Sequence, residues 1–108
     1  MSRIIDSGLE ELSVTLHKMG ELAYRIVLSA ISECIQNRQA YNEVRKMADA
    51  LVLMADNIED KAFELIARFQ PVASDLRTIK SYMKIAYDFV RFGRYALDMS
   101  YANQKLDG

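Results

Sequence analysis

Three aspartates in the middle of the chain have the residue type and spacing to hold a metal ion. Asp56 and Asp60 are four positions apart, and Asp49 lies seven positions before Asp56. On a helix these intervals place the three carboxylates on nearly the same face. Carboxylate oxygens are the ligands that hard cations prefer. One interpretation of Asp49, Asp56 and Asp60 is therefore a cation site.

The same carboxylates have a second interpretation, as partners of cations on a neighbouring helix. If the chain folds back on itself at Pro71, these three aspartates lie at the same level of the bundle as basic residues that follow Pro71. The expected pairs are Asp60 with Lys80 or Ser81, Asp56 with Lys84, and Asp49 with Arg91 or Arg94. Exposed pairs of this kind contribute only about 0–1 kcal/mol each but select which helices are neighbours. We favour charge pairing over a metal site.

Other reactive side chains occur singly. His17 is the only histidine, and Cys34 is the only cysteine. With no second histidine and no nucleophile placed beside a base, the sequence gives no support for triad chemistry or histidine-based metal catalysis. We expect His17 on the surface and Cys34 in the core, because an isolated apolar thiol usually packs inside. The sequence predicts no enzyme.

The bulk composition limits what the chain can bind. Its 108 residues allow one domain, expected over residues 1–108, and its net charge of −1 gives no overall attraction to nucleic acid or anionic lipid. Arg77, Lys80, Lys84, Arg91 and Arg94 do make one segment locally basic, which leaves an acidic partner segment or free phosphate open as its ligand. No run is apolar enough to span a membrane, and the first residues do not resemble a signal peptide. We therefore expect a cytoplasmic protein.

Apolar residues spaced three or four positions apart predict three long helices. The first pattern runs from Leu9 to Cys34, with a cap at Asp6 or Ser7 and an end near Asn37 and Arg38. Within it, Gly20 is expected to admit a close neighbour. The second pattern runs from Glu43 to Phe69 after a short turn, and the third from about Val72 to Lys105. The fold class is all-α, an antiparallel three-helix bundle with short turns.

The corner between the second and third helices is marked by Pro71. Proline disfavours the helical conformation in the residue before it, here Gln70, and suits the first turn of the next helix. Ser74 and Asp75 then offer oxygen acceptors to the unpaired N–H groups at the start of that helix. The sequence predicts a tight helical hairpin here.

The third helix carries two apolar stripes instead of one. The first consists of Leu76, Ile79, Met83, Ala86, Val90, Gly93 and Leu97. The second consists of Tyr82, Ile85, Phe89, Phe92, Ala96 and Met99. Two partner helices leave part of such a helix uncovered, so we expect Tyr82, Ile85, Phe89, Phe92 and Met99 to form a protein-interaction or dimer surface.

The stretch from Ile66 to Arg77 resembles the signature of the PhoU family of phosphate-uptake regulators. The motif residues are Gln70, Pro71, Ser74, Asp75 and Arg77. Met19-Gly20-Glu21-Leu22 and the segment from Lys84 to Gly93 are similar to two further family segments in the right order. Family members typically hold two three-helix repeats in one chain, whereas this chain has one. The resemblance therefore implies a homodimer in which two copies replace the tandem repeats.

The family also binds metal through paired acidic motifs on the second and third helices. Aligned on the corner, those positions fall at Ala55 and Glu59 and at Val90 and Arg94. Only Glu59 is a carboxylate, so we expect no cofactor. The weak metal candidates are Asp49, Asp56, Glu59 and Asp60.

The resemblance implies a non-enzymatic regulator that contacts a phosphate ABC transporter or its sensor kinase. It would meet the membrane only through that partner. Two alternatives remain: a regulatory module of another transport system, such as potassium uptake, and a metal-binding helical bundle.

Overall fold

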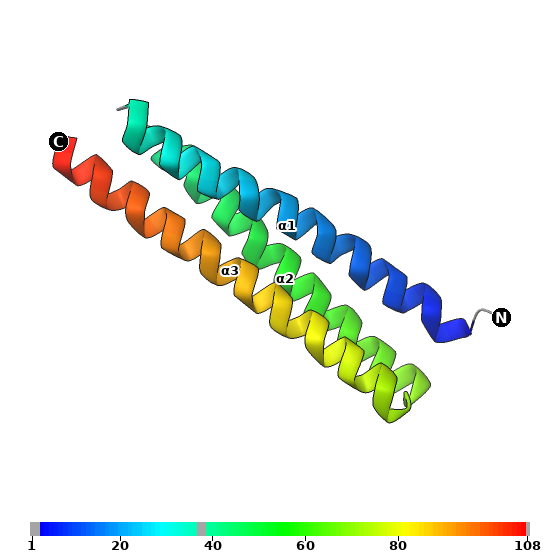
Figure 1. Cartoon of the computed structure of the whole chain (residues 1–108). Helices are drawn as coiled ribbons and strands as arrows, with labels where there is room; N and C mark the ends of the chain where they lie inside the picture. The colour runs from blue at the N-terminus through cyan, green and yellow to red at the C-terminus, as the bar shows by residue number, and fades with distance from the viewer. Residues whose placement is uncertain (1–2, 37–38, 108) are drawn as a thin grey trace.

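The computed structural model describes residues 3–36 and 39–107, which form three long helices (Figure 1). The helices are α1 (Ile4–Gln36), α2 (Tyr41–Phe69) and α3 (Ala73–Asp107). α2 runs antiparallel to α1 and α3, so the start of α1 lies near the start of α3. The bundle extends 56 × 21 × 17 Å. The predicted all-α three-helix bundle is confirmed, with no strand among the described residues. The predicted end of the first helix at Asn37 and Arg38 lies outside them.

The core follows the predicted apolar seams of all three helices. Its fully buried side chains include Leu12, Met19 and Ile26 of α1, Val44, Leu51 and Ile58 of α2, and Ile79 of α3. Over the described residues, none of the helices has an apolar stretch that could cross a bilayer.

Cys34 is exposed, so its expected place in the core is wrong. The seam of α1 advances from Ala30 by three residues to Glu33, whose side chain is fully buried. Alternating steps of three and four residues allow either Glu33 or Cys34 as the next inward position. The sequence analysis chose Cys34 for this inward position because it is the more apolar residue. In the structure Glu33 occupies it instead.

Gly20 does admit a close neighbour, as predicted. A Cβ atom at this position would lie 3.3 Å from the Phe89 ring, so α1 and α3 approach closely here. At Gly93 the space for a Cβ atom is filled by Leu51 of α2, at 2.9 Å. α3 therefore uses one face against each of the other helices.

The corner at Pro71 ends α2 as predicted. Gln70 adopts the left-handed conformation (φ 44°, ψ 62°), and its N–H donates to the Ile66 carbonyl at 3.0 Å. Pro71 itself lies before α3, which begins at Ala73; the expectation that it forms the first turn is wrong. The Leu76 N–H instead closes that turn on the Val72 carbonyl at 3.0 Å.

Candidate functional site

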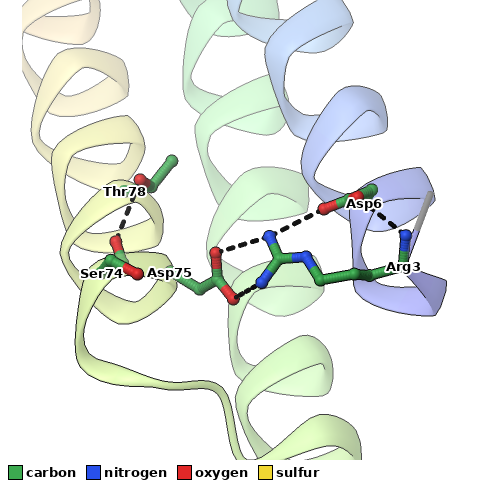
Figure 2. Close-up of polar contacts among 5 residues, drawn as sticks. All are labelled: Arg3, Asp6, Ser74, Asp75 and Thr78. Carbon is green, nitrogen blue, oxygen red and sulfur yellow. Dashed lines mark hydrogen bonds and ion pairs between the residues drawn. The ribbon is translucent and has the colours of Figure 1, made fainter. Parts of the chain in front are cut away.

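The signature corner fastens the start of α1 to the start of α3 (Figure 2). The Arg3 guanidinium donates two hydrogen bonds to the Asp75 carboxylate, at 2.8 and 3.0 Å. It also donates to Asp6 at 2.9 Å, and the Arg3 backbone N–H donates to the other oxygen of Asp6 at 2.9 Å. The Asp75 side chain is only 11% exposed. A motif carboxylate is thus used to join two helix starts that are far apart in the sequence.

The electrostatics of this corner follow from the same contacts. The hydrogen bond to Asp75, followed by that to Asp6, raises the pKa of the Arg3 guanidinium above its ordinary value. The Arg3 backbone N–H and then its guanidinium lower the pKa of Asp6. Asp6 accepts from the N–H of the residue before the first helical position, so it caps α1 from inside the first turn. The expectation that Asp6 or Ser7 stands before the helix is wrong, because α1 begins at Ile4.

The other motif residues shape the corner. Asp75 was expected to accept from the free N–H groups of α3, but its carboxylate binds Arg3 instead. Ser74 contributes its carbonyl, which accepts from the Thr78 hydroxyl at 3.1 Å (Figure 2). Gln70 and Arg77 are exposed. The motif therefore has an architectural role in this chain, through the turn at Gln70 and the tether at Asp75.

A pocket of about 370 Å³ lies between α2 and α3 and contains the positions of the family's metal motifs. Ala55, Glu59, Val90 and Arg94 all line it. The remaining lining residues are Val52, Asp56, Ile58, Met83, Ala86 and Tyr87. The alignment on Pro71 thus brought together four residues that do share one site, which we call the α2/α3 pocket.

The α2/α3 pocket does not fit a metal ion. Two of the four aligned positions are apolar, and the Arg94 guanidinium brings a positive charge to the place where a cation would bind. Asp56 and Glu59 are its only carboxylates. Over the described part of the chain, no three histidine, cysteine, aspartate or glutamate side chains gather closely enough to hold a metal ion.

The alternative use of the aspartates, charge pairing between α2 and α3, is also wrong. Asp49, Asp56 and Asp60 are exposed, and no ion pair among the described residues joins them to a cation of α3. Lys61 of α2 instead pairs with Glu11 of α1, at 3.2 Å. Residues at one level of a bundle need not face each other, since their direction around the helix decides what they meet.

An aromatic and cationic ridge runs along the outside of α3. Arg91 lies over the rings of Tyr87 and Tyr95, at 5.9 and 5.8 Å from their centroids. It also donates a hydrogen bond to the Tyr95 hydroxyl at 3.0 Å, which raises the pKa of its guanidinium. Tyr87 and Tyr95 are 61% and 53% exposed. We call Tyr87, Arg91 and Tyr95 the α3 ridge. Their spacing of four residues is visible in the sequence, but the stacking of Arg91 on the two tyrosines was not predicted.

The second apolar stripe of α3 lies beside α1. Tyr82 and Phe89 are half-buried and pack against the core, whereas Ile85, Phe92 and Met99 are exposed. α1 contributes the exposed side chains of Val27 and Ile31 to the same face, a contribution that the sequence did not indicate. A groove of about 190 Å³ runs between them, lined by Val27, Ala30, Ile31, Phe92, Tyr95, Ala96 and Met99. We call Val27, Ile31, Ile85, Phe92 and Met99 the α1/α3 strip.

His17 lies on the surface, as expected. Its ring is 79% exposed and lies 3.1 Å from Glu21, one turn along α1. This pair has no nucleophile or buried partner that would support proton transfer during catalysis.

Glu33 is a buried carboxylate that connects the three helices, and the sequence analysis did not identify it. Its Oε1 atom accepts hydrogen bonds from the Ala40 N–H at 2.7 Å and from the Ser100 hydroxyl at 3.1 Å. The buried carboxylate thus joins α1 to the start of α2 and to α3 at the end of the bundle opposite Arg3. Its other oxygen, Oε2, is buried without a hydrogen-bond partner. The signal that could have found it is its position on the apolar seam of α1.

These features define a class of protein before any comparison is made. The described residues form a rigid helical bundle whose polar clusters hold helices together, and whose exposed aromatic and apolar groups lie along α3 and α1. The class they define is an all-α three-helix bundle with exposed aromatic and apolar side chains.

The chain belongs to the PhoU family, because its residues 16–102 match the PhoU domain. It is 36% identical over 112 residues to the phosphate-specific transport system accessory protein PhoU homolog of Clostridium acetobutylicum, covering 98% of this chain and 49% of that relative. It is 33% identical over 94 residues to the homolog of Pseudomonas putida, covering 86% and 37%. The PhoU homolog 1 of Methanothermobacter thermautotrophicus is 33% identical over 98 residues, covering 91% and 42%.

The chain spans about half the length of the curated relatives it matches, or less. No solved structure matches it.

Proposed function

We propose that this protein is a non-enzymatic accessory regulator of phosphate transport. It acts in the cytoplasm by contact with a phosphate transporter or with the sensor kinase that reports on it. Membership of the PhoU family and the names of the relatives support a role in phosphate transport. The single structural observation that supports action by contact is the α3 ridge.

The ridge has the composition and order of a recognition surface. Tyrosine and arginine are the residues most often found to dominate binding energy at protein interfaces, together with tryptophan. Arg91 is held between two rings and by one hydrogen bond, so little side-chain freedom remains to be lost when a partner binds. Its charge is permanent at any physiological pH. A surface-exposed side chain that is already ordered is suited to recognition.

The α2/α3 pocket extends the same surface. Tyr87 belongs to both the ridge and the pocket, and Arg94 lies two turns further along α3 and also lines the pocket. An apolar floor flanked by Asp56, Glu59 and Arg94 suits a partner side chain with an apolar stem and a charged end. We propose that the partner contacts the ridge and inserts such a side chain into the pocket, where the relatives' metal positions have been replaced.

The test is capture from membranes of the source organism after mild crosslinking, with the bound proteins identified by mass spectrometry. The expected result is recovery of a phosphate transporter or its sensor kinase. Tyr87→Ala should reduce that recovery at least tenfold, because the residue is shared by ridge and pocket. Tyr24→Ala is the matched control: Tyr24 is 65% exposed, against 61% for Tyr87, and lies on α1. Recovery of a potassium transporter would move the protein to another transport system, and equal losses for both variants would remove the ridge from the account.

A further inference from the structure

The charges of the bundle are divided unevenly between its helices. α1 carries five acidic residues and two lysines or arginines, and α2 carries six and four. Between Arg77 and Arg94, in contrast, α3 carries five lysines or arginines and one acidic residue, Asp88. Because the whole chain has a net charge of −1, this positive segment is a local feature of α3.

The five cations of this segment lie along one line of α3, together with Tyr87 of the α3 ridge. Alternating steps of three and four residues separate its members, which brings them to one face of the helix. The line extends about 25 Å along the helix axis. Its members, all of them exposed, are Arg77, Lys80, Lys84, Tyr87, Arg91 and Arg94. We call this line the α3 basic stripe.

The charges of the α3 basic stripe are not neutralised within the bundle. Arg91 pairs with Asp88, at 4.0 Å. The other cations form no ion pair with any residue that the structure describes: Arg77, Lys80, Lys84 and Arg94. Like charges one turn apart on a helix repel each other. The stripe is therefore complementary to a partner that supplies a row of negative charges.

We propose that the α3 basic stripe binds an acidic α-helix of the partner protein, packed along α3. This inference rests on the proposed function, since the partner is the protein that contacts the α3 ridge. A helix with aspartate or glutamate at alternating steps of three and four residues presents its carboxylates in a line with the same spacing. About 17 residues of such a helix match the length of the stripe. Arginine binds carboxylates with two parallel hydrogen bonds, and Arg91 is already ordered by Tyr87 and Tyr95.

The surroundings of the stripe favour a narrow partner over a flat anionic surface. Asp56 and Glu59 of α2 are exposed, and they line the α2/α3 pocket beside Tyr87 and Arg94. A lipid surface or a nucleic acid that lies across both helices would bring its phosphates close to these carboxylates, and like charges repel. A helix is only about 10 Å wide, so it can contact α3 alone.

The test is crosslinking with a carbodiimide, which joins a lysine amine to a carboxylate only where the two groups are in direct contact. The full chain is captured from membranes of the source organism after this treatment, and the crosslinked peptides are sequenced by mass spectrometry. We expect Lys80 and Lys84 to be joined to one partner segment whose acidic residues recur every three or four positions. Crosslinks that avoid both lysines and form at Lys18 or Lys46 would overturn the proposal.

The same experiment separates this inference from the proposed function. The identity of the captured protein tests the proposed function, whereas the crosslinked residues test the stripe. A phosphate transporter that is crosslinked only at Lys46 would keep the function and refute the acidic helix. A different transporter that is crosslinked at Lys80 and Lys84 through an acidic helix would do the opposite.

A pair of variants supplies the control. Without crosslinker, Lys80→Gln together with Lys84→Gln should reduce recovery of the partner at least about tenfold, and added salt should weaken the binding of the wild-type chain. Arg45→Gln together with Lys46→Gln removes the same two charges from exposed positions of α2 and should leave recovery unchanged. Equal losses for both variants would attribute the binding to net charge and refute the proposal.

A lipid surface is the competing occupant, and it has its own measurement. The wild-type chain is sedimented with protein-free vesicles of phosphatidylglycerol or of phosphatidylcholine. We expect no binding to either. Sedimentation with phosphatidylglycerol alone that is lost in the variant with Lys80→Gln and Lys84→Gln would assign the stripe to lipid headgroups and overturn the proposal. Circular dichroism establishes that each variant is folded before it is compared.

Discussion

Removing the buried carboxylate of Glu33 should destabilise the bundle more than any other single change in its polar contacts. Glu33 is fully buried and accepts hydrogen bonds from the Ala40 N–H and the Ser100 hydroxyl. In Glu33→Ala both donors lose their acceptor. Ala40 precedes the first residue of α2, and no side chain caps that helix, so its N–H has no replacement at hand.

The magnitude follows from three contributions. Each buried donor left without a partner costs about 1–3 kcal/mol, with Ser100 at the lower end because a helical serine can turn to the carbonyl one turn before it. One buried methylene group, Cγ, is also lost, at about 0.8 kcal/mol. Against this, the unpartnered oxygen Oε2 disappears, which recovers about 1–3 kcal/mol. We expect a net loss of about 1–3 kcal/mol in the free energy of unfolding.

The assay is urea unfolding followed by circular dichroism, with all variants at one protein concentration. Glu33→Gln should stay within about 1 kcal/mol of the wild type, since its amide oxygen can accept both bonds and only the interaction of the charge with the start of α2 is lost. Glu10→Ala, an exposed glutamate of the same helix, should change stability by less than about 0.5 kcal/mol. If Glu33→Ala were no less stable than Glu10→Ala, the carboxylate would not hold the three helices together.

Three further predictions concern the acidic corner, the metal positions and the core. The backbone N–H and the guanidinium of Arg3 lower the pKa of Asp6 from its ordinary value of 3.8. The contribution of Asp6 to stability is therefore complete above pH 3.8, and it disappears as the pH falls through the lowered pKa. Asp6→Asn should therefore lower the melting temperature at pH 7 but not near pH 2, and equal losses at both would contradict this. Elemental analysis of the purified wild-type chain should find no stoichiometric iron, zinc or magnesium. Metal binding should appear in a variant that carries acidic residues at the aligned positions, Ala55→Glu, Val90→Asp and Arg94→Asp. Stoichiometric metal in the wild-type chain would overturn our account of the α2/α3 pocket. Leu51→Ala should cost about 2–5 kcal/mol in urea unfolding because Leu51 fills the space beside Gly93, whereas the exposed Leu53→Ala should cost less than about 0.5 kcal/mol.

The parts of the fold that could be predicted depend on local patterns. The seam of Leu12, Met19 and Ile26 identifies α1 without knowledge of its partners, because helical periodicity alone brings these residues to one face. The end of α2 before Pro71 is equally local, since proline disfavours the right-handed helical conformation in Gln70. The left-handed conformation that Gln70 adopts was not predicted. The place of Gly20 could also be anticipated, although the identity of Phe89 as its neighbour could not.

The parts that could not be predicted depend on which surfaces meet. Asp49 and Asp60 are exposed, and among the described residues neither forms an ion pair with a cation of α3, so the expected charge pairs do not form. Arg3 and Asp75 are 72 positions apart, and no spacing in the chain indicates that they bind each other. The α1 half of the α1/α3 strip was missed for the same reason. Val27 and Ile31 form part of a surface only because the packing of the helices places them beside Phe92.

By itself the sequence determined that there are three helices, where the hairpin turns and which family the signature resembles. These properties arise from backbone preferences and from the period of one helix. Only the tertiary structure decided that Glu33 rather than Cys34 enters the core, that Arg94 shares a pocket with Glu59, and that apolar side chains of α1 and α3 line one groove. Each of these depends on the rotation of one helix about its axis relative to another, which is set by the packing of all three together.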